Sequence, residues 1–182
     1  MKYILAPYKD PASGLDWDEQ TPIIKIQIQK CFSEYEKNIE YKIIETDHGK
    51  GADWPTIALV LMNAFFVIPA CHKKIRESIS EWKLIYNNIC GLTNWISEKF
   101  RILFYPKELL FLDALSKLEK SLDVDEIELL SIDEHEKIFE GMLCPENLKL
   151  ITFTFKQGDF VYQVGFSNER KLMFVNKIKL IT

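Results

Sequence analysis

The stretch LKLITFTFKQGDFVYQVGFSNERKLMFVNKI, residues 148–178, decides the fold class of this chain. It consists of three apolar runs separated by two short polar sequences, Gln157-Gly158-Asp159 and Ser167-Asn168-Glu169, which are typical of tight turns. The runs cover residues 148–156, 160–166 and 171–178. From residue 151 to residue 156 apolar and polar side chains alternate, as in a strand covered on one face. The stretch therefore predicts an antiparallel β-meander.

Upstream of the meander, strand and helix periodicities follow one another. Short strands are predicted over residues 2–6, 41–45, 101–105 and 127–132. Helices are predicted over residues 21–39, about 73–88, about 93–96 and 106–118, where apolar residues recur every three or four positions. Thr21-Pro22 is expected to begin the first helix, although Ile24, Ile26 and Ile28 also alternate and a strand is the alternative there. The expected fold class is α+β, with mixed N-terminal strands, several helices and a C-terminal antiparallel meander.

Residues 54–71 form the longest uncharged segment of the chain, eighteen positions in length. We expect a buried core helix, capped by Asp53, with Pro55 in its first turn and a kink at Pro69. The length is marginal for a membrane span, and Asn63 and Pro69 disfavour one. Membrane insertion and peripheral membrane association are therefore the less favoured alternatives.

Length and composition indicate an ordinary folded protein. The 182 residues suggest a helix-rich α/β part over 1–100 and an α+β part over 101–182, with one shared core as the alternative. The N-terminal sequence lacks the features of a secretory signal, so a cytoplasmic location is expected. The cysteines contain no Cys-x-x-Cys pair, and reduced thiols are expected rather than a disulfide or a metal site. The cysteines are Cys31, Cys71, Cys90 and Cys144. No oligomeric state is predicted.

Motifs for catalysis are incomplete in this sequence. His135-Glu136 lacks the second histidine of a zinc protease, because Phe139 stands at that spacing. Gly49-Lys50-Gly51 lacks the leading glycine and the following serine or threonine of a phosphate-binding loop. No catalytic residue, metal or cofactor is predicted. An enzyme or sensor that binds a small molecule between the helical half and the C-terminal sheet is the alternative, with Asp47, His48 and Lys50 as its candidate ligand loop.

The net charge of −4 conceals an asymmetry along the chain. Residues 106–145 carry eleven acidic and four basic side chains, whereas residues 146–182 carry three acidic and six basic ones. A negative field attracts a basic protein and repels nucleic acid, so nucleic-acid binding is not expected. The non-functional interpretation is a solvated surface that keeps the protein soluble, in which residues 133–136 form an acidic loop. The functional interpretation is a docking surface made of Asp123, Asp125, Glu126, Glu128, Asp133, Glu134 and Glu136.

The block Gly51-Ala52-Asp53-Trp54-Pro55-Thr56 stands between a predicted strand and the predicted apolar helix. In this setting, about residues 1–100 resemble the small effector-associated modules of bacterial conflict systems. The resemblance implies a protein-interaction role beside a toxin or defence effector, and it has no catalytic residues to carry over. We therefore expect a non-enzymatic protein-binding module, an immunity-type inhibitor or adaptor, that docks a basic partner through its acidic surface.

Overall fold

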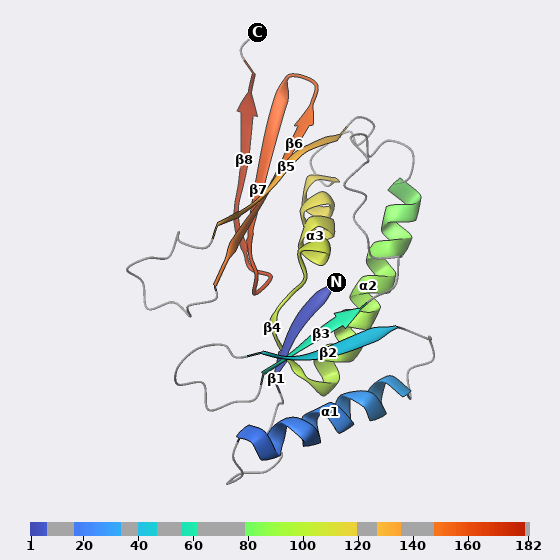
Figure 1. Ribbon diagram of the computed structural model, residues 1–182. Helices are drawn as coiled ribbons and strands as arrows, with labels where there is room; N and C mark the ends of the chain where they lie inside the picture. Colours follow the sequence, from blue (N-terminus) through green and yellow to red (C-terminus); the bar gives the residue numbers. More distant parts are fainter. Residues whose placement is uncertain are drawn as a thin grey trace. The chain divides into compact units, whose positions relative to one another are not determined.

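The computed structural model describes residues 1–6, 17–33, 40–46, 56–61, 79–119, 127–135 and 148–180 (Figure 1). Within them lie three helices and two four-stranded antiparallel sheets, which confirms the predicted α+β class. By its internal contacts the chain divides into two units, 1–66 with 91–105 and 67–90 with 106–182. The division expected from the sequence, 1–100 and 101–182, stays a prediction.

The sheet of the first unit has the strand order β2-β3-β1-β4, and neighbouring strands are antiparallel. Its strands are β1 (Lys2–Ala6), β2 (Tyr41–Thr46), β3 (Thr56–Leu61) and β4 (Arg101–Phe104). Helix α1 (Trp17–Ser33) connects β1 to β2, and α2 (Ile79–Lys99) precedes β4. Taken over the described elements, this is the order of the split β-α-β, ferredoxin-like arrangement. Many unrelated functions use that arrangement, so it describes the fold without indicating an activity.

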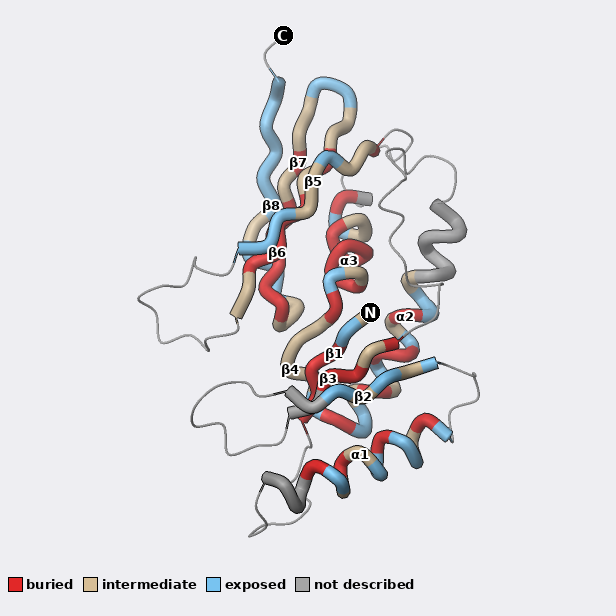
Figure 2. Tube along the Cα trace, viewed as in Figure 1, coloured by how far each residue is buried: buried red, intermediate tan, exposed pale blue. Residues whose placement is uncertain are grey.

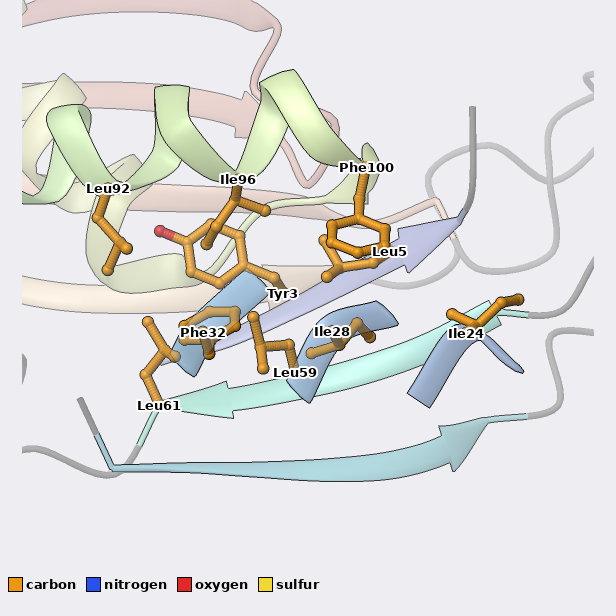
Figure 3. Packing of buried hydrophobic residues seen from close by; sticks show 10 residues of the cluster. All are labelled: Tyr3, Leu5, Ile24, Ile28, Phe32, Leu59, Leu61, Leu92, Ile96 and Phe100. Atoms are coloured by element: carbon orange, nitrogen blue, oxygen red, sulfur yellow. The ribbon is translucent and has the colours of Figure 1, made fainter. Parts of the chain in front are cut away.

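Both helices cover the same face of this sheet. Ile24, Ile28 and Phe32 recur at helical spacing on α1 and are buried against the β1 and β3 side chains (Figure 3). The C-terminal half of α2 contributes a second apolar row to the same cluster. The remaining members of the cluster are Tyr3, Leu5, Leu59, Leu61, Leu92, Ile96 and Phe100. The first unit therefore has a hydrophobic core of its own.

The helix predicted over 54–71 is wrong at residues 56–61, which form β3. β3 is an inner strand, paired with β1 on one side and β2 on the other. Ala58 and Leu59 project to opposite faces of the sheet and are both fully buried. A strand buried on both faces is apolar throughout and loses the alternation that identifies a strand in sequence. Residues 62–71 lie outside the described part. In that part, no helix combines the length and apolar character required to cross a membrane.

Two helix boundaries also differ from the predictions. Helix α1 begins at Trp17, so Pro22 lies inside it and Thr21 is not its N-cap. The alternative strand there is wrong, because Ile24 and Ile28 are buried while Ile26 is 63% exposed, as on a helix. Residues 35 and 39 of the predicted helix lie outside the described part.

Helix α2 continues through Gly91, where a break was predicted. Thr93 is consequently not a cap. It is buried in the helix, and its Oγ1 lies 2.8 Å from the hydroxyl of Tyr3 on β1 in a hydrogen bond. The buried partner explains why this side chain does not begin a new helix.

The second unit contains the predicted meander. Its sheet has the order β5-β6-β7-β8 and is antiparallel throughout, which confirms the prediction. The strands are β5 (Glu128–His135), β6 (Leu150–Gln157), β7 (Phe160–Ser167) and β8 (Leu172–Lys179). Helix α3 (Lys107–Glu119) packs on one face, where the Phe111 ring centroid lies 5.8 Å from that of Phe153 and 6.0 Å from that of Phe155.

Candidate functional site

The acidic residues proposed for partner binding lie in and around β5, an edge strand of the second sheet. Glu128, Asp133 and Glu134 are in the strand itself, and Asp133 and Glu134 are exposed. The interpretation of 133–136 as an acidic loop is therefore wrong for residues 133–135, because the ladder with β6 continues to His135. Asp123, Asp125, Glu126 and Glu136 lie outside the described residues, so their part in this surface stays a prediction.

The register of β5 against β6 sends these carboxylates to both faces of the sheet. Glu134 lies opposite Ile151, on the face that α3 covers, and its Oε1 is 3.4 Å from Lys107 Nζ. Asp133 points to the opposite face, where Ser131 donates a hydrogen bond of 2.7 Å to Oδ2. Glu128 lies opposite Lys156 in the register.

Two of the three β5 carboxylates thus have a lysine beside them. Both members of the Lys107–Glu134 pair are about half exposed, so the pair contributes little to stability and leaves the carboxylate available to a partner. The described residues of the β5 edge are negatively charged, but less strongly than the count of acidic residues along the sequence suggests.

The alternative ligand loop of Asp47, His48 and Lys50 lies outside the described residues, so the structure does not test it. Of the three histidines, His135 is described, and it is exposed at the end of β5. Within the described part of the chain, no group of three or more His, Cys, Asp or Glu residues is arranged to hold a metal ion.

A partly buried polar network that the sequence analysis missed connects α2, α3 and the β7–β8 turn of the second unit. Arg170 binds Asp113 with two parallel hydrogen bonds, from Nε to Oδ2 at 2.7 Å and from Nη2 to Oδ1 at 2.8 Å. The hydroxyl of Tyr86 donates to the same Oδ1 at 3.0 Å. Arg170 Nη2 also lies 3.8 Å from Cys90 Sγ. The Asp113 side chain is only 10% exposed, so its charge requires these partners.

The conformation of the β7–β8 turn brings the Arg170 side chain to Asp113 on α3. Arg170 has a φ of 67°, in the left-handed region that non-glycine residues rarely adopt. Its N–H donates to the Ser167 carbonyl at 2.9 Å, and the Asn168 carboxamide accepts a hydrogen bond from the Lys149 N–H at 3.1 Å. Ser167 and Asn168 are buried. The ion pair with Asp113 and the hydrogen bonds of the turn therefore hold the β7–β8 connection in this conformation.

The electrostatic environment of the network raises the pKa values of Tyr86 and Arg170. Burial, followed by the negative charge of Asp113, raises the pKa of Tyr86 above its ordinary value of 10. The hydrogen bonds to Asp113 raise the pKa of Arg170, against the opposing effect of burial. The phenol stays neutral and the guanidinium stays charged at any physiological pH. The network is suited to stabilising the unit.

One sequence signal could have identified this network. Asp113 interrupts the run Leu109-Leu110-Phe111-Leu112 before Ala114, and an isolated acid within an apolar helix requires a buried cation. The position of that cation, 57 residues later in a turn, has no signature in the sequence.

No family model, curated protein or solved structure matches this chain.

Proposed function

We propose that this chain is a non-enzymatic protein-binding module that docks a basic partner through the acidic edge strand β5. The observation that supports the proposal is the exposure of Asp133 and Glu134 at the end of the edge strand β5. Edge strands offer unpaired backbone groups as well as side chains, so such a strand combines a hydrogen-bonding template with negative charge.

The charge around β5 supports an electrostatic contribution to this binding. Residues 106–145 carry a balance of −7, and a field of this sign accelerates encounter with a cationic surface. At physiological ionic strength the field extends only about 8 Å, so the carboxylates must lie in or beside the interface to matter.

The proposal is tested with matched charge variants of the full chain. The β5 variant is Glu128→Gln, Asp133→Asn and Glu134→Gln, and the control Glu40→Gln, Glu98→Gln and Asp159→Asn removes the same charge elsewhere. Each tagged protein is used for affinity capture from its native lysate at low and high salt, and the affinity of the captured protein is then measured in pure form. We expect a basic partner whose affinity falls with salt and falls about tenfold in the β5 variant but not in the control. Equal affinities of both variants would contradict docking at β5.

Within this class, we propose an immunity-type inhibitor or adaptor of a bacterial toxin or defence system. The support is the resemblance of residues 1–100 to effector-associated modules. If the captured partner is a toxin, its expression alone should arrest bacterial growth, and co-expression of this chain should restore growth. The β5 variant should restore growth less well than the control. A partner with no effect on growth would exclude the toxin inhibitor while leaving protein binding at β5 intact.

A further inference from the structure

Strand β8, at the other edge of the same sheet, is exposed at every residue except Phe174, which is half-buried (Figure 2). Five large apolar side chains between 172 and 180 are 38–49% exposed, which is a high density for one strand of a monomer surface. They are Leu172, Met173, Val175, Ile178 and Leu180. Such an edge is a site where another chain can add a strand.

The backbone of β8 has one free side. The Leu180 N–H donates to the Asp159 carbonyl at 2.7 Å, which continues the ladder towards β7. Hydrogen-bonding direction alternates along an antiparallel strand, so Asn176 and Ile178 also face β7, whereas Val175, Lys177 and Lys179 direct their N–H and C=O groups outward. Among the described residues, no strand pairs with that outward side.

The side chains of β8 alternate between two faces of the sheet, and one of these faces carries both lysines of the edge. Lys177 and Lys179 lie opposite Tyr162 and Phe160, and Lys177 Nζ is held 4.1 Å from the Phe160 ring centroid. On the other face are Phe174 and Ile178. The Phe174 ring covers Gly165, where a Cβ would approach Phe174 Cε1 to 2.4 Å. In alternate positions the edge therefore presents one face with Val175, Lys177 and Lys179 and another face with Phe174, Asn176 and Ile178.

We propose that β8 binds an extended segment of a partner protein, in which acidic and apolar residues alternate, as a fifth strand of the sheet. The acidic residues would lie beside Lys177 and Lys179, and the apolar residues beside Phe174 and Ile178. Opposite charges on neighbouring strands stabilise a sheet, whereas a second copy of β8 would bring lysine rows together. This surface is separate from β5, so either proposal can fail without the other.

A display library of random 12-residue peptides, panned on the full chain at low salt, provides the probe. We expect the selected sequences to alternate acidic with apolar residues, and a synthetic peptide of that sequence to slow amide exchange at residues 175, 177 and 179. The Val175→Pro variant removes an outward N–H without taking a hydrogen bond from β7, so it should weaken peptide binding about tenfold. The matched control Val175→Thr keeps that N–H and should bind like the wild type.

A second variant tests the charge. Lys177→Glu with Lys179→Glu should lose about tenfold in affinity for the acidic peptide and should instead select basic peptides. Circular dichroism of each variant checks that the sheet is retained. Selection of basic peptides by the wild type, exchange protection at β5 instead of β8, or a dimer joined through β8 would each overturn the proposal.

Discussion

Asp113 and Arg170 form a bidentate ion pair inside the second unit. Their bidentate pair joins a helix to a turn far along the chain, and the carboxylate is almost buried. Removing one member of such a pair leaves the other charge without a partner in a poorly hydrated site. The pair also shows how far its contacts can be predicted from the sequence. Asp113 stands out as an acidic residue within an apolar run, but Arg170 resembles any solvated residue of a turn.

Asp113→Ala is therefore expected to lower the free energy of unfolding by about 3 kcal/mol. Combining it with Arg170→Gly, which removes the guanidinium and relieves the left-handed backbone, should cost less than the sum of the two single changes. Urea denaturation of the single and double variants measures this coupling. Lys171→Ala, which breaks the exposed contact with Glu169, is the control and should change stability by less than about 0.5 kcal/mol. Additive effects of Asp113→Ala and Arg170→Gly would show that the two residues act independently.

Tyr86 gives the network a dependence on alkaline pH. The unfolded phenol loses its proton near pH 10, whereas the folded protein retains it to higher pH. The folded state thus binds more protons above pH 10, so this contribution to stability is complete below pH 10 and is lost as the pH rises further. Tyr86→Phe should unfold at lower urea concentration than the wild type at pH 8, and the difference should narrow above pH 10. Unfolding curves whose separation is constant with pH would contradict the shift.

At the scale of the element, how accurately a segment was predicted from the sequence depended on how its faces are buried in the fold. The meander was predicted closely because β6 has one covered and one more open face, and Gly158, with a φ of 53°, marks its turn. β3 was mistaken for a helix because burial on both faces removed its alternation. The acidic strand β5 was predicted too short, since exposed carboxylates at its end resemble a loop until the partner strand β6 is known.

The break predicted in α2 leads to a stability prediction. Gly91 is exposed in the middle of a continuous helix, and a Cβ there would meet no atom within 4 Å. Gly91→Ala should therefore raise the free energy of unfolding by about 0.5 to 1 kcal/mol, because alanine loses less backbone entropy in a helix. Thermal and urea unfolding measure the gain. A loss of stability in Gly91→Ala would indicate that the helix needs to bend at this position.

At the scale of the whole molecule, the chain contains two sheets with separate sets of buried residues. The core cluster around Tyr3 and Leu59 draws only on elements of the first unit. Phe153 and Phe155 pack on α3 within the second unit. The two edges for which we propose protein binding, β5 and β8, both belong to the second sheet.

Two cores predict two unfolding transitions. Leu59→Ala should remove about 2 to 5 kcal/mol from the first unit and lower its transition alone. Phe153→Leu should lower the other transition and leave the first in place. Differential scanning calorimetry with both variants distinguishes them. A single transition that moves as one in both variants would show that the units unfold together.

The order of the elements along the chain has a consequence for synthesis. β1, made first, has β4 as one of its two neighbours, and β4 is made only after α2. β1 therefore stays an edge strand of the first sheet on the ribosome until about residue 104 has emerged, and the residues of α2 that belong to the second unit wait longer still for the meander. A chain arrested between β3 and β4 would present a buried strand of the finished protein as a bare template for aggregation. Translation stalls in that interval should be the ones that most burden the chaperones of the cell.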